Sequence, residues 1–349
     1  MMTKLVRKLA WPYRLLFAQR RREDYVAQAF SWWLAALRSG RPTIRCVLPG
    51  AHPLEGAADL AILVTFDKTG RVHDYLIHQM DALTRAGRTV ILVSNSPVFP
   101  VREQEKAARH CALVAWRHNH GYDFGAWRDG LMLAPDYDRL DSVIFANDSV
   151  YGPFQPLKPM LDRMKPDEAD VWGLTDSWDT RWHLQSYFIL YHRRALQHPD
   201  VRTMWRQWKH VNSKSWVIRN REIGLTAVLH KAGLNCAALF PYRDLVQDFA
   251  SEAAEVLAKK KSRLTQTERN LIDSILNLAN VSAPMNPTHY FWDRLILDGF
   301  PFLKREVLAS NPIGMPRLFE WERFVRSVSD YDTGLVDRHL RAILKHRMV

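Results

Sequence analysis

Short apolar runs that alternate with helical stretches constrain the fold of this chain more than any other feature. Leu60–Phe66, Thr89–Ser94 and Ser142–Ala146 are uninterrupted runs, which is typical of strands buried on both faces of a parallel sheet. Between the first two, apolar residues recur at helical spacing over residues 72–83. A strand, a helix and a strand joined by short links form a βαβ unit, so we predict an α/β domain with a mainly parallel sheet.

Composition divides the chain into three parts. Residues 1–45 form a basic amphipathic arm, in which ten Lys and Arg stand against two acidic residues. The arm therefore carries eight of the twelve net positive charges of the 349-residue chain. Pro42–Ala57 is rich in Pro and Gly and is interpreted as a linker. We predict that residues 58–248 are the α/β domain and that residues 249–349 are a helical C-terminal region.

The arm interleaves its arginines with Leu, Trp, Tyr and Phe, a pattern suited to an anionic membrane surface. The alternative is that the arm packs on its own domain while its arginines face water. No run reaches the roughly 18 apolar residues of a membrane span, and arginines interrupt any signal-peptide core. Three widely separated cysteines favour a reducing compartment and predict neither a disulfide framework nor a zinc site.

These observations predict a cytoplasmic protein that is peripheral to the inner face of the plasma membrane. Outside the arm the sequence shows no basic stripe and no RNA- or DNA-binding motif, so we expect no nucleic-acid partner.

Polar residues follow the predicted strands, at the edge where open parallel sheets bind their ligands. Asp67 follows the first strand, Asn95 the second, and Asn147-Asp148-Ser149 a later one. There is no Gly-x-Gly-x-x-Gly fingerprint and no Walker-type Gly-Lys-Ser/Thr, which argues against a dinucleotide oxidoreductase and a P-loop kinase. We expect Asp67 and Asn95 to line a nucleotide pocket.

Asp148 has a position similar to the one where nucleotide-sugar transferases of the GT-A type hold a divalent cation. Mg²⁺ or Mn²⁺ there neutralises the negative charge of a departing nucleoside diphosphate. Only Asp148 is acidic in this segment, with Asn147 beside it and Ser149 as a weak or water-mediated ligand. The alternative is that Asn147 and Ser149 merely cap a turn.

Two further segments bear on the same site. A polar loop that begins at Asn119 runs into a helix, and Gly121 and Asp123 suit it to approach a ribose or diphosphate closely. Glu222 opens a predicted helix, where its carboxylate can take a proton from an acceptor hydroxyl. The alternative for Glu222 is a first-turn carboxylate that complements the helix dipole.

Seven motifs, in the same order, resemble those of the rhamnan synthesis protein F family over roughly residues 60–340. They are Asn119-x-Gly121-Tyr-Asp123-Phe-Gly125-Ala-Trp127-x-x-Gly130-Leu131, Asn147-Asp148-Ser149-Val-Tyr151-Gly152-Pro153, Trp172-Gly173-Leu-Thr175-x-Ser177, His183-Leu-Gln185-Ser186-Tyr187-Phe188, Glu222-Ile-Gly224-Leu, Asn286-Pro-Thr288-x-x-Phe-Trp292 and Pro301-Phe302-x-Lys304-Arg305-Glu306. The resemblance implies a GT-A-like glycosyltransferase, of hexosyl- or rhamnosyltransferase type, in bacterial cell-surface polysaccharide assembly such as that of O-antigen. It implies a nucleotide-activated deoxysugar such as dTDP-L-rhamnose as donor and a growing lipid-linked glycan as acceptor.

Under this hypothesis Asp148 contacts the diphosphate through the metal, and Glu222 is the base of a direct inverting displacement. His183 and Gln185 lie on the approach to a predicted strand, where they contact donor or acceptor. A buried structural hydrogen-bonding role is the alternative for each of them.

Two rival functions remain open. One is a non-catalytic glycan-binding or scaffolding subunit with a degenerate transferase fold, because the full Asp-x-Asp pattern is missing. The other is a glycoside hydrolase, which also uses paired carboxylates. The hydrolase fits less well, since the polar loops at the strand ends suit a diphosphate.

Overall fold

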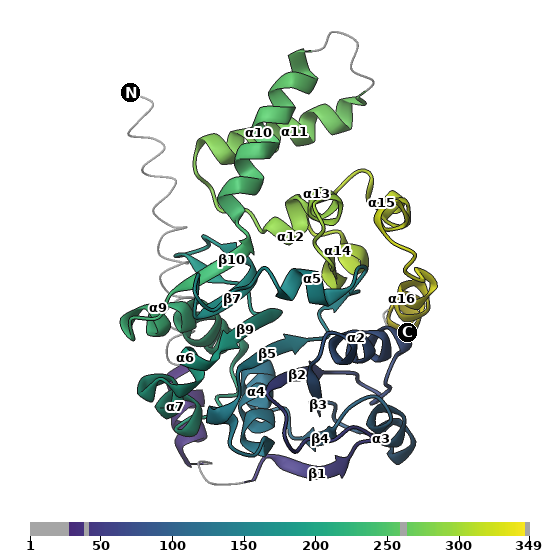
Figure 1. The fold of residues 1–349 in the computed structure, drawn as a ribbon. Helices are drawn as coiled ribbons and strands as arrows, with labels where there is room; N and C mark the ends of the chain where they lie inside the picture. Colours follow the sequence, from purple (N-terminus) through teal and green to yellow (C-terminus); the bar gives the residue numbers. More distant parts are fainter. Residues whose placement is uncertain (1–27, 38–41, 259–263, 346–349) are drawn as a thin grey trace.

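A computed structural model describes residues 28–37, 42–258 and 264–345, so residues 1–27 of the predicted basic arm lie outside the described part. Its strands are Ile44–Pro49 (β1), Asp59–Thr65 (β2), Thr89–Ser94 (β3), Leu113–Arg117 (β4), Ser142–Asn147 (β5), Val150–Tyr151 (β6), Val171–Ser177 (β7), His183–Leu184 (β8), Phe188–His192 (β9), Cys236–Phe240 (β10) and Leu303–Lys304 (β11). Within these ranges, nine strands form one sheet in the order β1-β4-β3-β2-β5-β9-β7-β10, with β8 paired to β7 (Figure 1). The two remaining strands, β6 and β11, pair with each other.

Most neighbours in the large sheet run parallel. The pairs β2–β3, β2–β5, β3–β4 and β7–β10 are parallel, whereas β9 runs antiparallel to both β5 and β7. This strand order and these directions confirm the predicted α/β class with a mainly parallel sheet. Six strands therefore end at one edge, which we call the carboxyl edge: Thr65, Ser94, Arg117, Asn147, Ser177 and Phe240 are the last residues of β2, β3, β4, β5, β7 and β10.

Helices cover both faces of the sheet. They are residues 28–37, Asp74–Arg85 (α2), Val101–Ala108 (α3), Tyr122–Leu133 (α4), Leu157–Leu161 (α5), Arg193–Gln197 (α6), Pro199–Arg206 (α7), Lys214–Val217 (α8), Ile223–Lys231 (α9), Tyr242–Ala258 (α10), Gln266–Asn280 (α11), Pro287–Tyr290 (α12), Trp292–Leu297 (α13), Arg305–Ser310 (α14), Trp321–Val328 (α15) and Gly334–Lys345 (α16). Leu60, Ile62 and Val64 of β2 pack with side chains of α4, α7 and α9, whereas Ala61 and Leu63 pack with α2 on the opposite face. Burial on both faces explains why this strand is an uninterrupted apolar run.

One local prediction is wrong. Pro42–Ala57 is not only a linker, because it contains β1, which pairs antiparallel with β4 at the edge of the sheet. An edge strand with one exposed face lacks the continuous apolar pattern of a central strand, so composition alone concealed it. The helices α6 and α7 are separate, because His198 is extended and Pro199 starts a new helix there.

The C-terminal region packs against the α/β domain. α10 runs through residue 249, and α10 and α11 project together from the sheet (Figure 1). The helices α12 to α16 descend along one side of the molecule until α16 contacts α2 (Figure 1). Trp292, Phe302 and Val336 belong to the same buried cluster as Leu63, so the two regions share one core. The division at residues 58–248 and 249–349 stays a prediction.

A short antiparallel ribbon, formed by β6 and β11, connects the end of β5 with the C-terminal region. Leu303 pairs with Tyr151 and Lys304 with Val150. Gly152 follows with a φ of +117°, a backbone conformation that side chains disfavour, and a Cβ there would lie 2.4 Å from the carbonyl oxygen of Pro301. Glycine is therefore required for this close approach of the two segments.

His339 on α16 is buried against this ribbon and gives the fold a pH dependence. Its Nδ1 is 2.8 Å from the hydroxyl of Tyr151, and its ring also contacts those of His73 and Tyr75. Burial, aided by His73 and Arg305, lowers the pKa of His339 from 6.5 to about 3, although Asp67 opposes the shift. Between these values the unfolded chain binds a proton that the folded chain does not, so acid destabilises the fold.

Lowering the pH from about 7.5 to about 5.5 is expected to remove about 1.3 kcal/mol of stability through His339 alone. The measurement is urea unfolding of the parent and of His339→Gln at both pH values. The variant should lose less stability on acidification than the parent by about that amount. Equal losses in the two proteins would contradict the assignment.

Candidate functional site

The side chain of Asp148 spans the carboxyl ends of the two central strands. It follows β5, and its Oδ2 accepts hydrogen bonds from Thr65 Oγ1 at 2.8 Å and from the backbone nitrogen of Phe66 at 3.0 Å. An Arg305 nitrogen lies 3.6 Å from the same oxygen. Asp148 is only 7% exposed, so its charge is stabilised by two hydrogen-bond donors and a nearby guanidinium at the carboxyl edge rather than by water.

Asn147 both caps a turn and holds Asp123. Its Oδ1 accepts from the backbone nitrogen of Ser149 at 3.1 Å and from Ser149 Oγ at 2.6 Å, which is the turn-capping role. Its Nδ2 donates to Asp123 Oδ2 at 2.9 Å. Burial and the nearby charge of Asp148 raise the pKa of Asp123 from 3.8 to about 6, against the opposing hydrogen bond from Asn147.

A glycine places Asp123 at this site. Gly121 is the N-cap of α4 and has a φ of +79°, and a Cβ there would lie 3.3 Å from the Cα atoms of Gly125 and His210. The chain can therefore turn tightly after β4 and aim the first turn of α4 at Asn147. Asn119, two residues earlier, has a buried Oδ1 for which the described residues provide no hydrogen-bond partner.

Glu222 also lies at the carboxyl edge, but it does not begin a helix as the sequence predicted. The helix does not open at Glu222: a π-helical turn, Ile218–Glu222, joins α8 to α9 without a break. Glu222 therefore lies within a helical segment, so complementing a helix N-terminus does not explain it. Its Oε1 accepts from Ser186 Oγ at 2.9 Å and from the Ser186 backbone nitrogen at 3.3 Å, which orients the carboxylate beside the start of β9.

Two cations at the site, Lys304 and Arg305, were not predicted as site residues. The backbone nitrogen of Arg305 donates to the carbonyl of Ser149 at 2.8 Å. Lys304 Nζ lies 3.3 Å from Ser149 Oγ and 4.5 Å from the ring centroid of Tyr187. The pairing of β11 with β6 thus brings two positive charges, from a segment 155 residues away, to the end of β5.

The electrostatic surroundings of Lys304 are unusual for a lysine. Burial lowers its pKa, while Glu222, Glu306 and Asp123 oppose the shift. The first and last of these carboxylates belong to the candidate site, so the ammonium group lies within the electrostatic reach of both. Lys304 belongs to the Pro-Phe-x-Lys-Arg-Glu motif of the sequence. Nothing in the spacing of that motif predicts that it lies near Asp148.

Two other predicted site residues, Asp67 and Asn95, already accept hydrogen bonds within the protein. Asp67 Oδ1 accepts from Thr69 and from the backbone nitrogen of Arg71, and its pKa is lowered because these bonds and His73 outweigh burial. Asn95 Oδ1 accepts from Arg117 at 2.6 Å. Both lie at the carboxyl edge, and their roles in a nucleotide pocket stay predictions.

His183 and Gln185 are also engaged in structural contacts. His183 Nδ1 is 2.9 Å from the carbonyl oxygen of Arg181. Gln185 Oε1 accepts from Thr175 Oγ1 at 2.6 Å, and the same hydroxyl lies 2.6 Å from the hydroxyl of Tyr187, whose ring underlies Lys304. Gln185 therefore supports the site through a neighbour, and contact with donor or acceptor stays a prediction for both residues.

The residues at the end of β5 do not fit a divalent cation well. Among the described residues, no cluster of three or more His, Cys, Asp or Glu side chains is arranged to hold a metal. Oδ2 of Asp148 is already bound by Thr65 and Phe66, and the guanidinium of Arg305 lies where a second positive charge would be repelled.

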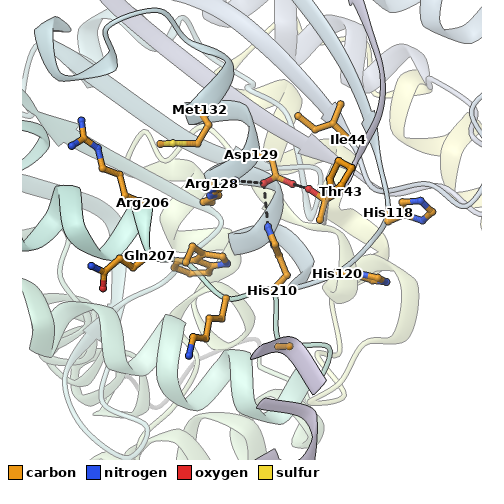
Figure 2. A pocket seen from close by; sticks show the side chains of 14 residues that line it. Thr43, Ile44, His118, His120, Arg128, Asp129, Met132, Arg206, Gln207 and His210 are labelled. Carbon is orange, nitrogen blue, oxygen red and sulfur yellow. Dashed lines mark hydrogen bonds and ion pairs between the residues drawn. The ribbon is translucent and has the colours of Figure 1, made fainter. Parts of the chain in front are cut away.

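A cavity of about 900 Å³ opens between α4, the segment after α7 and the start of β1 (Figure 2). Asp129 is one of the residues that line this cavity. Figure 2 shows Asp129 bound to Thr43 and to His210, whose Nε2 lies 3.2 Å from Asp129 Oδ1. Behind it Arg117, which is fully buried, donates to Asp129 Oδ2 at 2.7 Å. This network fixes the loop that leads from β4 to Gly121.

Comparison with known proteins places the chain among proteins of polysaccharide synthesis. The family model described as rhamnan synthesis protein F matches residues 90–280, more than half of the chain. Virulence protein VirA of Vibrio anguillarum is 29% identical over 248 residues, which cover 70% of this chain and 77% of VirA. The uncharacterized protein y4gN of Sinorhizobium fredii is 30% identical over 208 residues, which cover 58% of this chain and about half (53%) of y4gN.

Solved structures show only distant likeness. The apo structure of the bifunctional glycosyltransferase WbbM is 11% identical with a TM-score of 0.30, over 54% of this chain and 40% of that one. The mannosyltransferase PcManGT of Pyrobaculum calidifontis, in complex with GDP-Man and Mn²⁺, is 9% identical with a TM-score of 0.33, over 73% and 77%. Likenesses at this level carry no argument about substrate or metal.

Proposed function

This chain belongs to the rhamnan synthesis protein F family, and from that premise we propose that it is a glycosyltransferase. It moves a sugar, rhamnose or a related deoxysugar, from a nucleotide-sugar such as dTDP-L-rhamnose to a growing lipid-linked cell-surface polysaccharide such as O-antigen. One observation supports this most: three carboxylates, an amide and two cations from four separate segments meet at the carboxyl edge, namely Asp123, Asn147 and Asp148, Glu222, and Lys304 and Arg305. Such edges are where open α/β sheets bind nucleotides.

The positions of these groups suggest a role for each of them in binding the donor. The diphosphate of the donor lies at the end of β5, where Asn147 and Ser149 hold the turn that faces it. Asp123, at the start of α4, binds the ribose hydroxyls, and the tight turn at Gly121 lets the ligand approach the backbone. Asp67 and Asn95 flank the pocket at the ends of β2 and β3.

Glu222 is the base of the transfer. The acceptor hydroxyl oxygen attacks the anomeric carbon, and its proton passes to the Glu222 carboxylate as the new glycosidic bond forms. The bond between the anomeric carbon and the diphosphate breaks at the same time, so the nucleoside diphosphate leaves with the electron pair. The hydrogen bonds from Ser186 hold the carboxylate in one orientation for this step.

Release of nucleoside diphosphate tests the proposal directly. The purified chain is incubated with nucleotide-sugars, dTDP-L-rhamnose included, and with a lipid-linked glycan acceptor, and both nucleotide release and acceptor mass are followed. A mass gain of one deoxyhexose with stoichiometric nucleoside diphosphate supports the proposal. Donor binding without turnover would favour a scaffolding subunit, and sugar release from a polymer without nucleotide would favour a hydrolase.

The described end of the arm supports docking on a membrane. Residues 28–37 are helical, with Ala35 buried against the domain and Lys209 packed over Trp32. Phe30, Trp33 and Leu37 lie at spacings of three and four on the helix and are 57%, 52% and 59% exposed. This arrangement combines packing on the domain with an apolar stripe left for a lipid surface, so we place the protein on the cytoplasmic face of the inner membrane. None of the helices in the described ranges is long and apolar enough to span a membrane.

Replacing Phe30, Trp33 and Leu37 together by serine is expected to weaken binding to anionic vesicles by about tenfold or more, because three apolar side chains no longer enter the interface. Co-sedimentation with phosphatidylglycerol vesicles measures the effect. Phe319→Ser, which removes a 79% exposed phenylalanine from another surface, is the matched control and should bind like the parent. Equal binding by the triple variant would remove this helix from the membrane contact.

A further inference from the structure

We propose that Lys304 and Arg305 form the diphosphate-binding site of this protein and neutralise the departing nucleoside diphosphate without a divalent metal. The inference rests on the proposed glycosyltransferase function and names the groups that bind the donor phosphates. It replaces the metal expected at Asp148, whose surroundings do not fit one.

The position of the two cations is the first support. Lys304 Nζ and the backbone of Arg305 both contact Ser149, the residue that ends the turn after β5. This is the place where the sheet presents its carboxyl edge to a nucleotide. The pairing of β11 with β6 holds the backbone of Lys304, and the hydrogen bond from the Arg305 backbone nitrogen to Ser149 holds that of Arg305, so their placement does not depend on flexible side chains alone.

Both cations have binding capacity that the protein does not use. Within the described residues, Lys304 forms no ion pair, and its ammonium contacts only a hydroxyl and the face of Tyr187. Arg305 donates to the Tyr75 hydroxyl at 3.1 Å and lies 3.6 Å from Asp148 without a hydrogen bond to it. A guanidinium has five N–H donors, so several remain for phosphate oxygens.

Burial makes an anion favourable here. Lys304 is half-buried, and its pKa is lowered because burial removes hydration from the ammonium, while Glu222, Glu306 and Asp123 oppose the shift. A phosphate oxygen would replace that hydration with a charge-assisted hydrogen bond. The guanidinium matches phosphate geometry in a bidentate manner, while the ammonium acts as a point charge.

Asp148 then has a different role from a metal ligand. Bound by Thr65 and Phe66, it offers Oδ2 to the guanidinium and so fixes the orientation of Arg305. Asp148 is a positioning residue in this arrangement. The displacement itself needs no further reactant: the bond from the anomeric carbon to the diphosphate breaks, and the two cations balance the charge that develops on the leaving oxygen.

Nucleoside diphosphate binding to the full chain, measured by calorimetry, tests the inference. UDP, GDP and dTDP are each titrated in excess EDTA and again with Mn²⁺. The parent should bind at least one of them equally well in both conditions. Lys304→Met, which keeps the apolar stem over Tyr187, should weaken that binding about 10- to 100-fold. Affinity for the matching nucleoside, which lacks phosphates, should stay unchanged.

Two variants serve as controls. Lys209→Met removes another lysine packed over an aromatic ring, at 4.1 Å from Trp32, and should bind like the parent. Lys304→Arg retains the charge and should recover most of the affinity, which keeps the test valid if Lys304→Met folds poorly. Binding that requires Mn²⁺, or that Lys304→Met leaves intact, would overturn the inference while leaving the transferase function in place. Failure of every nucleotide and nucleotide-sugar to bind in both conditions would remove the proposed function, and the inference with it.

Discussion

Replacing Arg117 by methionine is expected to lower the free energy of unfolding by about 3–5 kcal/mol, the largest stability effect of any single change considered. Arg117 is fully buried at the end of β4, and its three nitrogens donate to Asp129, to Asn95 and to the carbonyl of His120 at 2.6–2.7 Å. Burial lowers the pKa of Arg117 while Asp129 opposes the shift. Methionine fills the space but leaves the Asp129 carboxylate, only 1% exposed, without its main partner.

Denaturant unfolding measures the loss, and Arg128→Met is the matched control. Arg128 contacts the same carboxylate at 3.1 Å, but its side chain is 27% exposed. Its removal should cost at most about 1 kcal/mol, as for other solvent-screened pairs. The double variant Arg117→Met/Asp129→Leu should recover part of the stability, because no buried carboxylate is then left without the guanidinium of Arg117. An unfolding midpoint for Arg117→Met equal to that of the parent would contradict the structure.

Replacing Glu222 by glutamine is expected to lower kcat by about 10²- to 10⁴-fold, the contribution typical of a positioned general base. Glutamine keeps the length of the side chain and an oxygen that accepts from Ser186, so the local geometry is retained. What it loses is the capacity to take the proton of the acceptor hydroxyl. Affinity for the nucleoside diphosphate should change little, since the proton transfer belongs to the chemical step.

The control for this variant is Glu306→Gln. Glu306 also lies within the electrostatic reach of Lys304, but its side chain is 62% exposed on α14 and has no contact with Ser186. A change of local charge alone would affect both variants alike, whereas loss of a base affects only Glu222→Gln. Undiminished transfer by Glu222→Gln would remove the base assignment, and weaker nucleotide binding with normal kcat would give Glu222 a binding role instead.

The sequence predicted those parts of the site that depend on sheet topology. Asn147 is the last residue of β5, Asp148 follows it, and Asp123 follows the turn after β4. Because parallel strands end at one edge, their proximity follows from the order of the strands. The Asn147–Asp123 hydrogen bond agrees with that expectation, although it assigns no role in binding.

The remaining features depended on contacts that leave no periodic signal. The strands β6 and β11 are two residues each, too short for a pattern, yet their pairing decides where Lys304 and Arg305 lie. The expected helix start at Glu222 failed because a π-helical turn continues the backbone through it. Arg117 was not among the predicted residues, because no local sequence pattern indicates that Asp129 and Asn95 accept its hydrogen bonds.

The ribbon of β6 and β11 also bears on the order in which parts of the site form while the chain is being synthesised. The sheet can assemble from residues up to Phe240, because all six strands that end at the carboxyl edge have then been made. Lys304 and Arg305 are translated some sixty residues later and reach Ser149 only when β11 aligns with β6. A nascent chain on the ribosome would therefore complete the strands of its sheet before it carries the two charges proposed to bind phosphate, and under that proposal it would not bind donor until β11 is in place.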